Sequence, residues 1–282
     1  MRALAALGLL LALAACSQAR HDHGPTFAEA RAAGEATVRV LYVPAEGWAY
    51  ADDGEVPTGV TADLMRDFAG WVEREYDIAL ELTFVAEHDW QVFYGRVRDG
   101  HGGVFGLGNV TITDARRGEL AFSPPYLENV AVLITPEDVA TLDEAARAPE
   151  VLDGLDALAF RGTLHQQRLE RLRSDYWPDM RINHADSNDA IIERVAAGGH
   201  FAYIDAYNYW RAREAGVPLR HHPAMDDPGE RFGIIMPHDS DWAAALAAYF
   251  AADGGLVQRD DYRALLERHL GEAVAEMLAG AR

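Results

Sequence analysis

The sequence contains no lysine and only one cysteine, and its basic residues are few. The absence of lysine excludes Schiff-base chemistry and a lysine general base. The lone cysteine, Cys16, excludes an internal disulfide framework. The sequence has 45 acidic residues and 25 arginines, so the formal net charge is −20. Such a chain repels nucleic-acid phosphates unless it carries a basic patch, and none is visible. We therefore expect no nucleic-acid partner.

Cofactor motifs are missing as well. There is no phosphate-binding glycine loop followed by Lys-Ser/Thr and no paired CxxC, so we expect no cofactor. What remains is an ordinary globular composition, 49% hydrophobic and 25% charged over 282 residues. That length suits one large domain or two of modest size.

The amino terminus has the pattern of a secretion signal. Met1–Arg2 is positive, and Ala3–Leu13 is an apolar run too short for a stable transmembrane helix. The segment Leu13–Cys16 reads Leu-Ala-Ala-Cys and resembles the lipobox of bacterial lipoproteins. We predict a signal peptide over 1–15 and lipidation of Cys16, which would tie the protein to a membrane. An ordinary signal cut after Ala15 is the alternative.

Residues 16–36 are polar and rich in small side chains, which predicts a lipidated, flexible tether. His21 and His23 lie within this tether. His221–His222 stand beside Pro223, near the second of the two expected crossings between the two halves of the fold. A histidine pair is a weak indication of metal, and we expect no metal site.

From residue 37 onward, strand patterns alternate with helix patterns. Val38–Val43 alternates in the manner of a strand, and Thr61–Tyr76 carries apolar residues at helical spacing. The same order returns after Ala157–Phe160 and again near the end at Phe232–Met236. Strands alternating with helices indicate an α/β fold, here as two units with the second inserted into the first. The predicted boundaries are 37–128 and 229–282 for lobe 1 and 129–228 for lobe 2.

One stretch favours a carboxylate site. Gly108–Arg117 runs from an apolar strand into hydroxyl and amide side chains and then Arg116. Hydroxyls and a planar guanidinium together grip carboxylate oxygens, and ligands of α/β sheets sit at the carboxyl ends of strands. The chemistry alone fits equally well a surface loop in which Arg116 makes a structural ion pair.

This stretch resembles the signature of the family 3 extracellular solute-binding proteins, the polar amino-acid receptors of ABC transporters. That signature runs Gly, small residue, Thr/Ser-Ile-Thr-x-x-Arg, then Phe-Ser-x-Pro-Tyr. Further landmarks of the family appear in order, in Gly59–Leu64, Phe160–Thr163 and Phe232–Met236. The resemblance implies a two-lobed periplasmic-binding-protein fold of type II with a two-strand hinge.

The resemblance also implies residue roles. Arg116 would bind an α-carboxylate, with Thr111 and Asn109 donating to it. Thr163 would reach the same group from the second lobe. Asp205 would accept from an α-ammonium, and its alternative role is a helix N-cap.

The resemblance further implies that aromatic residues form the apolar walls of the ligand site. Trp48 or Tyr50, together with Trp90, would supply apolar faces, and core packing is the alternative for each. The chain also departs from the family, because Gly100–Gly103 and Gly198–Ala202 both lack the usual aspartate. The second lobe therefore matches less well than the first.

The function implied is a monomeric extracytoplasmic receptor, anchored by lipid, that closes on a small polar solute and delivers it to an ABC permease. The ligand class implied is an amino acid or a related carboxylate. One alternative is an enzyme of dehydratase type, with His165 or His200 and Glu193 or Asp205 as acid and base. Another is a sensory lipoprotein that reports the ligand to a partner.

Overall fold

The computed structural model describes residues 22–51 and 55–280. The predicted signal peptide and Cys16 lie outside the described residues. Within the described ranges, no helix combines the length and the apolar character that a membrane span requires.

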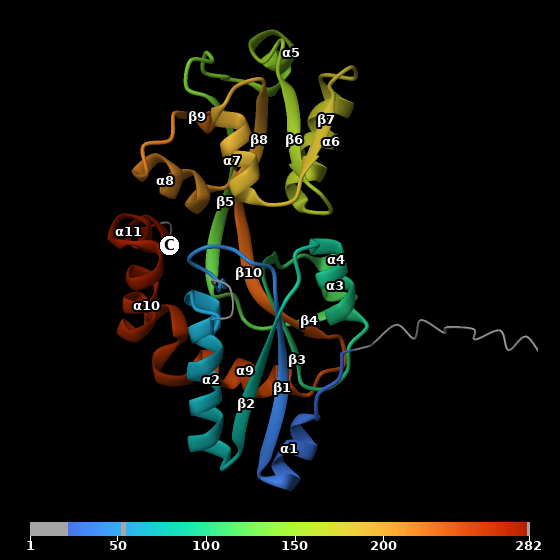
Figure 1. Cartoon of the computed structure of the whole chain (residues 1–282), viewed down its shortest axis with the longest axis vertical. Coiled ribbons are helices and arrows are strands. Elements are labelled where there is room, and N and C mark those ends of the chain that lie inside the picture. The colour runs from blue at the N-terminus through green and yellow to red at the C-terminus, as the bar shows by residue number, and fades with distance from the viewer. Residues whose placement is uncertain (1–21, 52–54, 281–282) are drawn as a thin grey trace, which may run out of the picture.

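The chain forms two lobes, one above the other in Figure 1. Lobe 1 holds strands β1 (Glu35–Tyr42), β2 (Ala79–Ala86), β3 (Val104–Thr111) and β4 (Leu120–Phe122). Its helices are α1 (Phe27–Ala33), α2 (Val60–Tyr76), α3 (Trp90–Arg98), α4 (Asp114–Arg117), α9 (Trp242–Ala251), α10 (Asp260–Leu270) and α11 (Glu272–Gly280).

Lobe 2 repeats the α/β arrangement on a smaller scale. Its strands are β6 (Asp156–Phe160), β7 (Ile182–Ala185), β8 (His200–Asp205) and β9 (Leu219–His221). Its helices are α5 (Ala148–Val151), α6 (Leu164–Asp175), α7 (Asn188–Ala196) and α8 (Ala206–Glu214).

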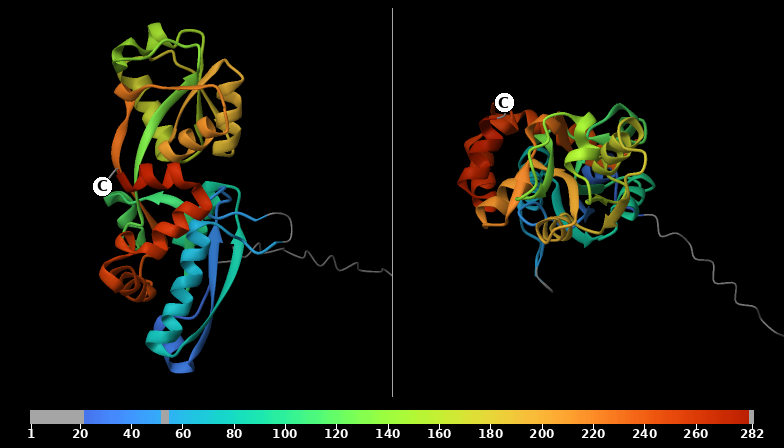
Figure 2. Two further views of the ribbon diagram at one scale, coloured as in Figure 1. Left: turned by 90° about the vertical axis from the view of Figure 1, so that its left-hand side faces the viewer. Right: turned by 90° about the horizontal axis from the view of Figure 1, so that it is seen from above.

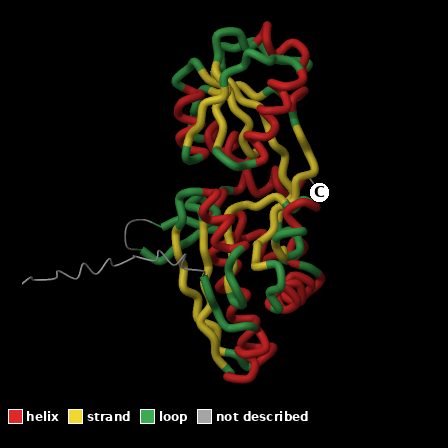
Figure 3. Tube along the Cα trace, turned by 90° about the vertical axis from the view of Figure 1, so that its right-hand side faces the viewer, coloured by secondary structure: helices red, strands yellow, loops and turns green. Residues whose placement is uncertain are grey.

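Two long strands join the lobes, β5 (Leu127–Pro136) and β10 (Asp227–Pro237). They pair antiparallel with each other and run from one lobe into the other, as Figure 3 shows in yellow. The sheet order is therefore continuous, β2-β1-β3-β10-β5-β8-β6-β7. The predicted lobe boundaries at 128/129 and 228/229 fall inside these two strands. A pair of strands is the flexible kind of connection that hinge closure requires.

The helices cover the sheet because each has one apolar face. In α2 the buried residues include Leu64, Phe68 and Val72, which recur at helical spacing and pack toward the core of lobe 1. The side view in Figure 2 shows α2 and the carboxyl-terminal helices flanking the lobe 1 strands. Burial of these faces supplies the main stabilisation of the lobe.

The amino-terminal segment corrects one expectation. Residues 22–36 belong to the fold of lobe 1 and not to a flexible tether. The carboxylate of Asp22 is 4% exposed and accepts two hydrogen bonds from Arg96, at 2.9 and 3.1 Å. A Cβ on Gly24 would lie 2.4 Å from the carbonyl oxygen of Gly103, so glycine permits this close approach. Composition suggested a tether because it cannot show such long-range contacts.

Candidate functional site

A cavity of about 260 Å³ lies between the lobes. Its walls come from the loop before α2, from the carboxyl end of β3, from the first turns of α6, α7 and α8, and from the hinge strand β10. The polar ends of several elements therefore meet in one enclosed space, which is the typical setting of a ligand site in an α/β protein.

The structure brings most of the predicted site residues to this cavity. Six of the eight line it, namely Trp48, Trp90, Asn109, Thr111, Thr163 and Asp205. Arg116 and Tyr50 do not line it. The backbone of Tyr50 pairs with that of Thr58 in the loop before α2.

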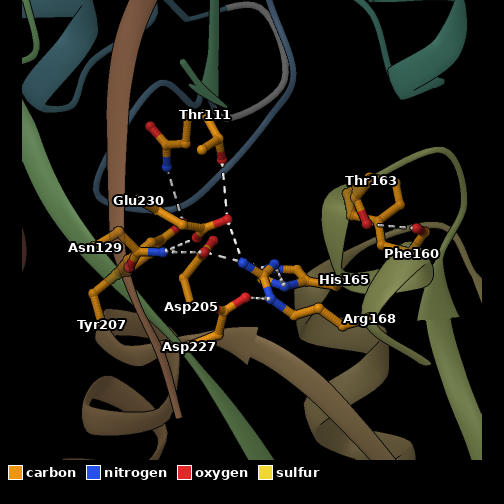
Figure 4. Close-up of polar contacts among 11 residues, drawn as sticks. Thr111, Asn129, Phe160, Thr163, His165, Arg168, Asp205, Tyr207, Asp227 and Glu230 are labelled. Atoms are coloured by element: carbon orange, nitrogen blue, oxygen red, sulfur yellow. Dashed lines mark hydrogen bonds and ion pairs between the residues drawn. The ribbon is translucent and has the colours of Figure 1, made fainter. Parts of the chain in front are cut away.

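Two buried carboxylates lie side by side at the cavity wall. Asp205 ends β8 and Glu230 lies on β10, and they are 7% and 6% exposed. The side-chain amide of Asn129 on β5 donates to both, at 2.7 Å each (Figure 4). Asp205 occupies the N-cap position of α8, yet its side chain makes no capping hydrogen bond. Its carboxylate instead faces the inter-lobe network.

A single arginine partly balances this pair. Arg168 of α6 is 7% exposed and forms ion pairs with Glu230 at 2.8 Å and Asp227 at 2.7 Å. Its third partner is Nδ1 of His165, at 3.3 Å. Because arginine only donates, His165 Nδ1 accepts, and the proton on Nε2 points toward Asp205, 3.3 Å away.

The predicted hydroxyl donors are engaged within the protein. Thr111 Oγ1 donates to Glu230 Oε1 at 3.3 Å. Thr163 Oγ1 donates to the carbonyl oxygen of Phe160 at 2.8 Å, also drawn in Figure 4. Thr163 is the N-cap residue of α6, but its side chain does not bond the helix amides.

Arg116 lies outside the cavity, in an outer groove lined also by Tyr94, Arg98 and Glu119. Its Nη1 donates to the carbonyl oxygen of Thr111 at 3.0 Å, and its guanidinium carbon lies 5.1 Å from the ring centre of Trp90. Burial lowers the pKa of this guanidinium from its ordinary value. Trp90 lines both the cavity and the outer groove, whereas Arg116 lines the outer groove alone. The carboxylate-binding role of Arg116 stays a prediction, since its position in this structure does not supply it.

Asn109 links the two lobes instead of pointing a free amide at a ligand. Its Nδ2 donates to the hydroxyl of Tyr207 on α8 at 2.9 Å, and its Oδ1 accepts from Tyr126 at 2.8 Å. Asn109 has φ 49°, a left-handed conformation that asparagine tolerates better than most residues. Burial raises the pKa of both tyrosines above the ordinary value, so both stay protonated.

Further contacts between residues of the cavity lining join the lobes. Arg211 of α8 forms an ion pair with Glu46 at 2.7 Å. The ring of Trp48 lies 5.1 Å from that of Tyr207, edge to face. The lobes therefore touch around the cavity, as expected for a closed arrangement.

Sequence reasoning missed Glu230, Asn129 and Arg168. Nothing local marks them, because Glu230 and Asn129 lie on hinge strands and Arg168 lies in a helix rich in polar residues. The one sequence feature that could have indicated Glu230 was its position, two residues before the predicted return strand that begins at Phe232.

His21 lies outside the described residues, and the two histidines of the pair His221–His222 have separate partners. His221 bonds Asp226 at 2.6 Å, whereas His222 lies between Thr135 Oγ1 and the amide of Leu142, at 2.9 Å each. Among the described residues, no three histidine, cysteine or acidic side chains are grouped so as to hold a metal ion.

Comparison with known proteins gives the same architecture. No protein-family model matches the sequence, and a search of curated proteins finds no match. Solved structures do match. The arginine-, lysine-, histidine-binding protein ArtJ from Geobacillus stearothermophilus is 18% identical, with 84% of this chain and 96% of that one covered and a TM-score of 0.64. A substrate-binding protein of an ABC uptake transporter from Streptococcus pneumoniae, with bound histidine, is 16% identical, with 88% and 96% covered and a TM-score of 0.66.

A third similar structure is the ancestral amino-acid-binding protein AncCDT-1, a precursor of cyclohexadienyl dehydratase. It is 18% identical, with 83% of this chain and 95% of that one covered and a TM-score of 0.63. At such identities a likeness defines the fold. The chain has the two-lobed fold of type II periplasmic binding proteins, which confirms the fold that the sequence resemblance implied.

Proposed function

We propose that this chain is an extracytoplasmic solute-binding receptor that closes its two lobes around a small polar solute. The cavity between the lobes carries this proposal, because both lobes and the hinge contribute buried polar side chains to one space. A ligand held from both sides favours the closed state by its differential affinity for that state. The amino-acid-binding proteins among the similar structures support the same reading.

The proposed partner is the membrane permease of an ABC importer, to which a closed receptor would deliver its solute. We further propose that Cys16 is lipidated and holds the receptor at a membrane.

The first experiment is a thermal-shift screen of residues 17–282, a piece that contains every described residue. The panel holds amino acids, peptides, organic acids, amines and sugars. A solute at one hundred times its Kd should stabilise the protein by about 2.7 kcal/mol, a shift of several degrees in Tm. If no solute of any class raises Tm, the receptor proposal fails.

The lipid anchor is tested separately with Cys16→Ser in the full chain expressed in a Gram-negative host. We expect the wild type to label with palmitate and to sediment with membranes. The serine variant should lose the label and become extractable without detergent. Membrane association that survives in the variant would contradict the anchor.

A second candidate function is an enzyme on this scaffold, favoured by one contact. His165 Nε2 lies 3.3 Å from Asp205, and both residues line the cavity, so they form a possible acid/base pair. His200 bonds Arg194 and the carbonyl oxygen of Gly198, away from the cavity lining. Product analysis after long incubation with each stabilising ligand tests this candidate, and a ligand recovered unchanged argues for the receptor.

A further inference from the structure

The side chains expected to bind a carboxylate are engaged elsewhere in the protein. The donors expected for that task are already donating to acceptors of the protein, Thr111 to Glu230 and Thr163 to Phe160. Arg116 stands in the outer groove. A ligand carboxylate in the cavity would therefore lack these three side chains, which the resemblance assigns to it, and burying a carboxylate without a charged partner is costly.

The cavity instead has an excess of negative charge. Asp205 and Glu230 are buried at its wall, and Asp186 and Asp189 stand exposed among its lining residues. Among the described residues, Arg211 is the one arginine that lines the cavity, and it is paired with Glu46.

The buried part of this charge is only partly neutralised. Arg168 is shared between Glu230 and the half-exposed Asp227, at 2.8 and 2.7 Å. Asp205 has only Asn129 and His165 as partners of its Oδ1, and no hydrogen bond within the described chain uses its Oδ2. A buried carboxylate of this kind favours a cationic partner.

The same cavity contains two neutral donors without a partner among the described residues, Nε1 of Trp48 and Nδ2 of the buried Asn208. Trp48 is 1% exposed and lines the cavity, and its Nε1 has no hydrogen-bond partner among the described residues. An indole N–H suits an uncharged oxygen acceptor such as an amide carbonyl or a hydroxyl.

Resting on the receptor function, we propose that the ligand is an organic cation without a carboxylate. Its ammonium or guanidinium group is held by Asp205 and Glu230, and a neutral oxygen of the ligand accepts from Trp48. Glu230 is then the residue that determines specificity. It accepts hydrogen bonds from Thr111 and Arg168, and without it these two donors would be available to an anion. The resemblance implied a role for Asp205 but none for Glu230.

The test uses matched ligand series that differ only at the carboxyl group. Arginine is compared with argininamide and agmatine, lysine with lysinamide and cadaverine, and leucine with leucinamide and isopentylamine. Affinities are measured by isothermal titration calorimetry on residues 17–282. We expect an amide or amine to bind at least tenfold more tightly than its parent amino acid in every series that binds.

Other results overturn the proposal. If the parent amino acids bind as tightly as their amides, the carboxylate has a partner and the cation proposal is wrong. If no member of the three series binds but a sugar or an organic acid does, the cation proposal falls and the receptor function stands. If no solute of any class binds, both fall.

A pair of variants tests the role of Glu230. Glu230→Gln should weaken amide or amine binding at least tenfold and reduce its advantage over the parent amino acid, because Arg168 loses a carboxylate. Glu119→Gln removes the same charge in the outer groove, where Glu119 accepts from Tyr94 at 3.2 Å, and should change affinity less than twofold. Glu230→Asp keeps the charge and should retain the preference if Glu230→Gln does not fold. Equal effects of Glu230→Gln and Glu119→Gln on the preference would overturn this assignment.

Discussion

Single residues in this protein owe their properties to neighbours that are distant in the sequence. Asp205 has the backbone geometry of an N-cap, yet its carboxylate bonds Asn129 across the hinge. Arg116 follows a carboxylate-binding pattern in the sequence, yet two aromatic rings and a backbone carbonyl hold it outside the cavity. Local sequence therefore identifies which residues are polar and near the site, whereas packing decides what each one binds.

The Arg116→Ala variant distinguishes a ligand that carries a carboxylate from one that lacks it. If the ligand lacks a carboxylate, we expect its affinity to change less than threefold, because Arg116 lines the outer groove and not the cavity. If a carboxylate reaches Arg116, losing a charge-assisted bond of about 1.5–3 kcal/mol weakens binding tenfold or more. Calorimetry with the tightest ligand distinguishes these outcomes, and a melting curve of the empty variant confirms that it folds.

His222 should make stability depend on pH. The side chain is fully buried, and burial lowers its pKa from 6.5 to about 4. Between these values the unfolded chain binds the proton and the folded chain does not, so acid favours unfolding. The stability that depends on neutral His222 is fully present above pH 6.5 and is lost as the pH falls toward 4. The resulting loss in the free energy of unfolding is at most about 3 kcal/mol.

Urea unfolding from pH 7.5 to 4.5 measures this effect. Glutamine can accept from Leu142 and donate to Thr135 as His222 does, but it does not titrate. His222→Gln should therefore flatten the pH dependence over this window. An unchanged slope in the variant would assign the effect to other groups.

Elements are positioned in this protein by contacts between chain segments that composition cannot reveal. Helix α1 begins at a capping box formed by Thr26 and Glu29, and its first amides also donate to Asp241 at the start of α9. The segment before it is fastened through Asp22 to α3 and β1. The amino-terminal segment is thus a structural part of lobe 1.

Asp22→Asn tests this anchoring. The substitution leaves Arg96 with Glu87 as its remaining partner and removes charge-assisted bonds, so the free energy of unfolding should fall by about 2 kcal/mol. Asp143→Asn serves as the control, because Asp143 is 66% exposed in its pair with Arg147 and such pairs contribute little. Chemical denaturation measures both variants, and equal stabilities would contradict the structural role of Asp22.

At the scale of the whole molecule, two strands and a few contacts across the cavity set the balance between open and closed lobes. The ion pair between Arg211 and Glu46 joins α8 to the loop of lobe 1, and α8 also packs against α11. These contacts join groups of the protein alone, so they stabilise the closed state of the empty protein as well as that of the loaded one.

Arg211→Gln should shift the empty protein toward the open state. We expect a larger radius of gyration by small-angle X-ray scattering and a return to the wild-type value at saturating ligand. The control is Arg213→Gln on the same helix, since Arg213 pairs with Glu137 inside lobe 2. If both variants scatter like the wild type, the Arg211–Glu46 pair does not govern closure.

What the sequence determined by itself is the class of fold. Alternating strand and helix periods recur on both sides of a central insertion, and short-range patterns of this kind are set by residues close together in the chain. The sequence also indicated Thr111, because polar residues at the carboxyl end of a strand are placed where α/β proteins bind ligands. The family resemblance added Thr163 and Asp205. Only the tertiary structure decided the charge of the cavity, since Glu230, Asn129 and Arg168 come together from β10, β5 and α6. The contacts among these three residues depend on how the two lobes close over the hinge, and a local sequence pattern does not predict them.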